Sequence, residues 1–223
     1  MRLLNFVLFI LSLFTIHIVF AQHNYFEGQI TYDVNYTPDN DSYSNHSLRM
    51  SIGSRIVFTF KDGNSKKEYF NPTGELLSTR YLNLDLDKSF AVYSGQDTVL
   101  WFDITENGSL TEYTYLNDTI IDGYECLIAQ AKSSTTVYGE TYNFSSDYCM
   151  GKSLRVNPEW FVNYKEGNYN EFVMEMPYIF VESNNHSFYW TQHIKLEKVE
   201  ARKVKKSEVL YKPNKKTPLK ELK

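Results

Sequence analysis

Residues that commonly build catalytic and metal centres are scarce in this sequence. The 223 residues include 2 cysteines and 5 histidines, with no Gly-x-Ser-x-Gly, phosphate-binding loop, His-Glu-x-x-His or Cys-x-x-Cys motif. Beyond residue 21, the nearest pair of histidines is His186 and His193, whose spacing would place them on opposite faces of a strand. We therefore predict no catalytic residue, no metal site and no cofactor, and hence a protein that is not an enzyme.

The sequence also lacks a strong overall charge. Its 23 Lys and Arg against 27 Asp and Glu give a net charge of −4 at pH 7, so no nucleic-acid partner is predicted. Basic residues concentrate near the C-terminus, where residues 195–223 contain 11 Lys or Arg and 4 Asp or Glu. We interpret residues 203–223 as a basic, partly frayed tail; the alternative is a surface patch for lipid headgroups or nucleic acid.

The sequence contains one long apolar run, and it lies at the N-terminus. Arg2 precedes the apolar stretch Leu3–Phe20, and Val19-Phe20-Ala21 has the small residue typical of a cleavage site. We predict a signal peptide over residues 1–21, followed by a single β-rich domain over residues 22–223 with no transmembrane segment. An uncleaved membrane anchor is the alternative, which polar residues such as His17 disfavour. The predicted location is the periplasm, the outer membrane surface or the extracellular space.

Hydrophobic alternation with a period of two recurs along the chain, and no helical period is found before Lys195. The stretch Tyr25–Tyr36 shows it best, because every second residue from Ile30 onward is Ile, Tyr or Val. Ser47–Ile52 and Arg55–Phe60 are the next predicted strands.

Turn signals separate these strands at short intervals. Asp62-Gly63, Asn107-Gly108 and Asp122-Gly123 are dipeptides that tolerate the positive φ angles of type I′ hairpins. Short strands at this spacing predict a mainly β (α+β) fold: a single curved antiparallel sheet, forming an open or half-closed barrel with few short helices.

Both cysteines lie in one predicted hairpin. If the chain reverses near Val137–Gly139, the antiparallel register places Cys126 roughly opposite Cys149, to within a residue or two. We predict a disulfide between them, because an exported protein folds under oxidising conditions.

Aromatic residues supply the positive signal for function. They make up 16% of the chain, with 18 Tyr and 15 Phe, and they recur on the inward phases of successive strands. Such a surface is either an ordinary packed core or the wall of a cavity for an acyl chain or another apolar ligand. The residues predicted to line such a cavity are Phe58, Phe60, Leu100, Phe102 and Trp190.

Three segments resemble the GLPGLI family, a group of exported, uncharacterised proteins of Bacteroidetes. They are Tyr25–Tyr32, Ile121–Ala131 and Glu175–Glu182, where Met-Pro-Tyr-Ile falls at the family's Leu-Pro-Gly-Leu-Ile and Tyr178 replaces the Gly. The chain therefore resembles that family as a divergent relative of it. The resemblance implies a lipoprotein-carrier type of fold, in which an unclosed curved sheet over a few helices can hold lipid, and an envelope location. It implies no catalytic residue.

Two non-catalytic functions are predicted from the sequence, while a third, an envelope hydrolase, would require two or three of His186, His193 and the carboxylates to converge in one cleft. The first is an exported cell-envelope protein that binds a lipid-like or other apolar ligand in a β concavity without catalysis. The alternative is a structural or surface interaction module that binds an envelope protein partner through exposed strands or the basic tail.

Overall fold

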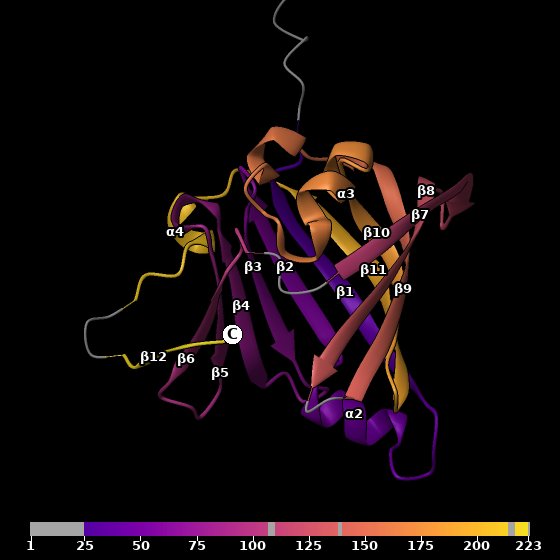
Figure 1. Cartoon of the computed structure of the whole chain (residues 1–223), viewed down its shortest axis with the longest axis vertical. Helices are drawn as coiled ribbons and strands as arrows, with labels where there is room; N and C mark the ends of the chain where they lie inside the picture. The colour runs from indigo at the N-terminus through magenta and orange to yellow at the C-terminus, as the bar shows by residue number, and fades with distance from the viewer. Residues whose placement is uncertain (1–24, 107–109, 138–139, 214–216, 223) are drawn as a thin grey trace, which may run out of the picture.

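The described part of the chain folds into one curved sheet of twelve strands with a few short helices around it (Figure 1). The computed structural model describes residues 25–106, 110–137, 140–213 and 217–222. The predicted signal peptide and the Asn107-Gly108 turn lie outside these described residues. No helix within the described residues has the length and apolarity needed to cross a membrane.

The strands form two consecutive groups along the chain. The first group is β1 (Gly28–Pro38), β2 (Arg55–Lys61), β3 (Asn64–Phe70), β4 (Leu76–Asn83), β5 (Lys88–Tyr93) and β6 (Val99–Asp103). The second group is β7 (Leu110–Ile121), β8 (Tyr124–Val137), β9 (Glu140–Arg155), β10 (Tyr178–His186), β11 (Trp190–Ala201) and β12 (Leu219–Glu221).

The strand order shows an open sheet rather than a closed barrel. It runs β12-β6-β5-β4-β3-β2-β1-β11-β10-β9-β8-β7, so β1 and β11 join the two groups at the centre and β7 lies at one edge. The short strand β12 is separated from the rest of the second group and lies at the other edge, beside β6. Neighbouring strands pair antiparallel, except that β12 runs parallel to β6. The predicted mainly β fold with a single curved, unclosed sheet is therefore confirmed.

The central strand β1 positions the core. Its alternating residues Ile30, Tyr32, Val34 and Tyr36 are all buried, as the period of two predicted. They join a cluster that also includes Ile56 from β2 and residues of β8 to β11. The concave side of the sheet therefore carries the main hydrophobic core.

Two of the predicted hairpin turns are confirmed. Asp62 and Gly63 have φ angles of 48° and 78°, and Asp122 and Gly123 have φ angles of 50° and 82°, as type I′ geometry requires. Gly63 is also needed for space, because a Cβ atom there would collide with the side chains of Leu84 and Trp160.

The few short helices of the predicted fold are present, but the positions of those before Lys195 were not predicted. Within the described residues, the α-helices α2 (Asn45–Ser51) and α3 (Tyr169–Glu175) and the 3-10 turns η2 (Leu84–Leu86), η3 (Pro158–Phe161) and η4 (Glu166–Asn168) lie there. The predicted strand Ser47–Ile52 is wrong, because Ser44 and Ser47 form a reciprocal capping box that starts α2. Each α-helix has seven residues, too few for a 3.6-residue period to show in the sequence.

The C-terminal segment packs onto the outer face of the sheet. Helix α4 (Lys206–Val209) contacts β2, β3 and β4, and Val209 is fully buried. The Asn83 side chain donates to the Tyr211 carbonyl at 3.0 Å and accepts from the Tyr211 amide at 3.3 Å. Buried apolar contacts and hydrogen bonds therefore hold the predicted, partly frayed tail against the sheet as far as Tyr211.

Candidate ligand-binding cavity

A cavity of about 350 Å³ lies on the concave side of the sheet. Its walls come from both strand groups and from residues 158–175, here called the α3 segment, in which η3, η4 and α3 cover one end of the concavity (Figure 1). The lining is mainly aromatic and aliphatic and includes Tyr32, Ile56, Phe58, Phe60, Tyr69, Leu82, Phe102, Tyr113, Tyr148, Met150, Phe161, Tyr164, Tyr169, Phe172, Ile179, Phe180 and Ile194.

The register of β2 to β6 explains why these side chains converge. Directly paired residues share a face of an antiparallel sheet, and successive pairs form a row across the strands. One such row runs Phe60, Ser65, Leu82, Ser89, Phe102. All five residues line the cavity, so this row forms one wall of it.

The α3 segment and the strand β7 form the opposite wall. The Tyr113 ring of β7 stacks on Phe172 of α3 with ring centroids 4.4 Å apart, and its hydroxyl donates to the Gly167 carbonyl at 2.9 Å. Tyr164 and Tyr169 contact each other at 4.7 Å between centroids. Burial raises the pKa of Tyr113, Tyr164 and Tyr169, so these hydroxyls stay neutral at physiological pH.

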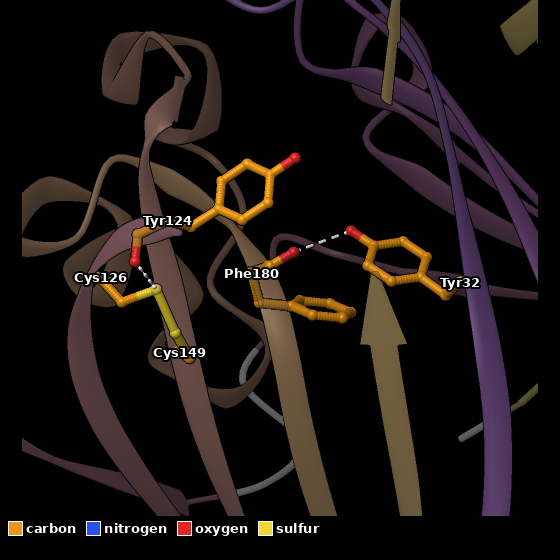
Figure 2. The surroundings of a disulfide bond; sticks show 5 residues. All are labelled: Tyr32, Tyr124, Cys126, Cys149 and Phe180. Atoms are coloured by element: carbon orange, nitrogen blue, oxygen red, sulfur yellow. Dashed lines mark hydrogen bonds between the residues drawn. A yellow bond between two sulfur atoms is a disulfide. The ribbon is translucent and has the colours of Figure 1, made fainter. Parts of the chain in front are cut away.

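Tyr32 connects the centre of the sheet to β10 (Figure 2). Its hydroxyl donates to the Phe180 carbonyl at 2.9 Å, and its ring stacks on the Phe180 ring at 4.9 Å between centroids. Because β11 lies between β1 and β10 in the sheet, this contact spans the concave side. Burial strongly raises the pKa of Tyr32, which keeps the hydroxyl a donor.

Two basic side chains also line this apolar cavity. Lys67 of β3 pairs directly with Phe58 of β2 on one side and with Arg80 of β4 on the other. These three residues form a second row across the strands, and all of them line the cavity. The Lys67 ammonium lies 5.3 Å from the centre of the Phe58 ring, and the Arg80 guanidinium lies 5.5 Å from the centre of the Tyr69 ring. Burial, and to a smaller extent Arg80, lower the pKa of Lys67 to about 8.

The structure brings three of the five predicted lining residues together. Phe58, Phe60 and Phe102 line the cavity. Leu100 shares the face of Arg80 but lies two strands further along, outside the lining. Trp190 packs against Tyr43, which precedes α2, with ring centroids 5.4 Å apart, and it is not part of the lining either.

The sequence prediction missed Lys67, Arg80 and the α3 residues. Lys67 follows Ser65 and precedes Tyr69 at a spacing of two, and all three line the cavity. That spacing was the available signal, but β3 has no apolar alternation to draw attention to it. The α3 residues carried no comparable signal, since the helix itself was not predicted.

The predicted disulfide is confirmed. Cys126 of β8 and Cys149 of β9 are bonded, with their Cα atoms 5.5 Å apart, and both are buried (Figure 2). The register pairs Cys126 with Gly151 and Ile128 with Cys149, so the cysteines stand two residues away from direct opposition. This offset lies within the uncertainty of the sequence prediction.

The histidines lie apart from the cavity. His186 Nε2 is 3.4 Å from an Asp147 carboxylate oxygen, while the His193 ring contacts Thr37 and Asn184. Among the described residues, no group of three or more His, Cys, Asp and Glu side chains is arranged to hold a metal ion.

Fold and site together define a protein with an open, curved β-sheet and an aromatic cavity whose lining includes two basic side chains, Lys67 and Arg80. No protein-family model and no curated protein matches the sequence. Among solved structures, the chain is similar to the Mycobacterium tuberculosis lipoprotein LppX, with 8% identity, a TM-score of 0.33, and coverage of 80% of this chain and 89% of that one. It is also similar to LprF from Mycobacterium bovis, with 9% identity, a TM-score of 0.33, and coverage of 80% and 88%. Both are distant similarities, and the function proposed below follows from this chain's own residues.

Proposed function

We propose that this protein is an exported cell-envelope protein that binds a lipid-like ligand in the concavity of its sheet, without catalysis. The observation that carries the proposal is the cavity itself, about 350 Å³ in volume and lined mainly by aromatic and aliphatic side chains. Binding pockets for small molecules commonly measure about 300–1,000 Å³ and have such a lining. The signal-peptide prediction and the resemblance to the GLPGLI proteins, both still predictions, support the envelope location.

The aromatic lining suits a flexible apolar chain. Phe58, Phe60 and Phe102 line the cavity from the sheet, and Phe161 of η3 and Phe172 of α3 line it from the α3 segment. Transfer of an acyl chain from water into such a lining is favourable by about 0.8 kcal/mol for each buried methylene group.

Native mass spectrometry tests the proposal directly. Residues 22–223 would be purified from a bacterial periplasm and measured before and after extraction with organic solvent. We expect a bound lipid-sized mass that disappears on extraction. If the unextracted protein binds neither a co-purifying lipid nor an added neutral fluorescent amphiphile, the proposal is wrong.

A cavity-filling variant provides the matched control. Leu82→Trp places a large ring in the row that lines the cavity, so we expect it to abolish uptake of the neutral amphiphile. Leu86→Trp makes the same change at a residue that is 49% exposed, and uptake should be retained. Circular dichroism would check that both variants fold.

A second function is favoured by the edge strand β7. It is 12 residues long, pairs with β8 on one side, and lies at the end of the sheet, with Leu116 and Ile120 exposed by 47% and 71%. An exposed apolar edge of this length is able to pair with a strand from a partner protein. Leu116→Lys with Ile120→Lys should abolish capture of such an envelope partner and leave lipid uptake intact.

A further inference from the structure

The lining of the cavity contains two cations and no anion. Lys67 and Arg80 line it, and no Asp, Glu or His does so among the described residues. Within that part of the chain, neither the Lys67 ammonium nor the Arg80 guanidinium makes an ion pair or a hydrogen bond with a protein group. The neighbouring Lys66 differs, because it pairs with Glu68 at 2.9 Å on the other face of β3. Strand β3 thus has two consecutive lysines on opposite faces. Lys66 has a carboxylate partner, and Lys67 has none among the described residues.

This arrangement is unfavourable for the empty protein. Directly opposite residues in an antiparallel pair have their Cβ atoms about 5 Å apart, and like charges at that position repel each other. Lys67 is also partly removed from water, which disfavours its charged form. The rings of Phe58 and Tyr69 compensate only in part, at 5.3 and 5.5 Å. A purely apolar ligand would require neither cation.

We propose that Lys67 and Arg80 together bind the anionic headgroup, a carboxylate or a phosphate, of an amphiphile whose chain lies among the aromatic side chains of the cavity. This inference rests on the proposed function and specifies the chemical class of the ligand. Arg80 presents paired N–H donors to such a group, and Lys67 adds a second charge from the adjacent strand.

The exposure of the side chains gives the orientation of the ligand. Arg80 is exposed and Lys67 is half-buried, whereas Phe161 and Phe172 at the α3 side are buried. The headgroup therefore lies toward solvent at β3 and β4, where it keeps part of its hydration. The acyl chain of the ligand extends toward the α3 segment, where the lining residues Phe161 and Phe172 are buried.

A series of ligands with one chain length and different headgroups tests this inference. Dodecanoate, dodecyl phosphate and dodecanol would each be titrated against the protein loaded with a neutral fluorescent amphiphile, at pH 7, and inorganic phosphate would be added alone. We expect the two anions to bind at least about tenfold more tightly than the alcohol, since a hydrogen bond to a charged group typically changes affinity by this factor or more. Inorganic phosphate should not displace the probe.

Variants then assign the preference to the two cations. Lys67→Met and Arg80→Met should each remove most of the preference for the anions, measured as the ratio of dodecanoate affinity to dodecanol affinity in the same variant. Lys66→Met, on the same strand but facing away, should behave as the wild type. Circular dichroism would check that each variant is folded.

Several results would overturn the inference. Equal affinity for dodecanol and both anions in the wild type would do so, as would a preference that survives in the Lys67→Met/Arg80→Met double variant. Displacement by inorganic phosphate as effective as that by dodecyl phosphate would indicate a site for a free anion instead of an amphiphile. If none of the three dodecyl compounds displaces the probe or binds by itself, the proposed function fails together with the inference.

Discussion

At the scale of single residues, Lys67 links the cavity to pH. Its pKa of about 8 is lowered by burial and by Arg80. The other ionisable groups in the cavity lining are Arg80 and several tyrosines, among them Tyr69 and Tyr148, whose pKa values burial raises. Lys67 is therefore the lining group that loses charge when the pH rises moderately above neutral.

This gives a prediction for ligand affinity. The carboxylate of dodecanoate is fully ionised above pH 7, so a change in its affinity between pH 7 and pH 9 reports on the protein. We expect the affinity to fall by up to about tenfold per pH unit above 8, because the protein must take up a proton at Lys67 to bind the anion. Fluorescence displacement across this range would measure it. Dodecanol affinity should stay constant, and a flat dodecanoate profile would contradict the prediction.

The same residue gives a prediction for stability. The folded-state pKa of Lys67 lies below its ordinary value of 10.5, so the unfolded chain binds more protons between about pH 8 and 10.5. The buried charge of Lys67 lowers the free energy of unfolding by its full amount below the folded-state pKa. This destabilisation disappears as the pH rises through the window between the two pKa values. Lys67→Met should therefore raise the free energy of unfolding at pH 7 by about 1–3 kcal/mol.

Urea denaturation at several pH values would check this prediction. The difference between Lys67→Met and the wild type should narrow from pH 8 to pH 10, because the wild type loses its buried charge over that range. Lys66→Met serves as the control on the opposite face. A Lys67→Met variant that is less stable than the wild type at pH 7 would mean that packing of the lysine stem outweighs its charge.

Residue faces were predictable from the sequence, but the extent of the cavity was not. The period of two correctly places Phe58, Phe60 and Phe102 on the concave side. It also places Leu100 on the face of Arg80, yet the cavity ends before that residue. The limit is set by the curvature of the sheet and by where the α3 segment covers it, and neither property is encoded in alternation along one strand.

At the scale of elements, the turns and helices that could be predicted are those whose residue types are specific to one local conformation. The Asp-Gly turns at Asp62 and Asp122 were predictable because the positive φ angles favour specific residue types. Helix α2 was not, because its start depends on a Ser44–Ser47 capping box that lacks the usual acidic residue. The docking of Val209 was also missed, since the surrounding lysines resemble a solvated tail.

The disulfide gives a prediction for the hairpin β8–β9. It links residues separated by 23 positions, and replacement by Cys126→Ala/Cys149→Ala should lower the free energy of unfolding by about 3 kcal/mol. The main reason is the larger conformational freedom of the unfolded chain without the bond. Urea denaturation with and without a reductant would measure it. Reduced wild type should approach the double variant, and a variant as stable as the oxidised wild type would contradict the prediction.

At the scale of the whole molecule, β7 contributes to the cavity and also forms one edge of the sheet. Its residue Tyr113 lines the cavity, whereas its other side has no neighbouring strand among the described residues. Residues Leu116 and Ile120 of β7 do not line the cavity. Ligand binding and partner binding should therefore respond to different substitutions.

Thermal unfolding tests this independence. A ligand that binds only the folded state at about 100 times its Kd stabilises by about 2.7 kcal/mol, which for a chain of this size raises Tm by roughly 5–10 °C. We expect dodecanoate to raise the Tm of the wild type and of Leu116→Lys/Ile120→Lys equally. Leu82→Trp should show no shift, because its ring occupies the ligand's space. A shift reduced by the β7 substitutions would mean that the edge strand and the cavity are coupled, since the ligand would then discriminate between arrangements of β7.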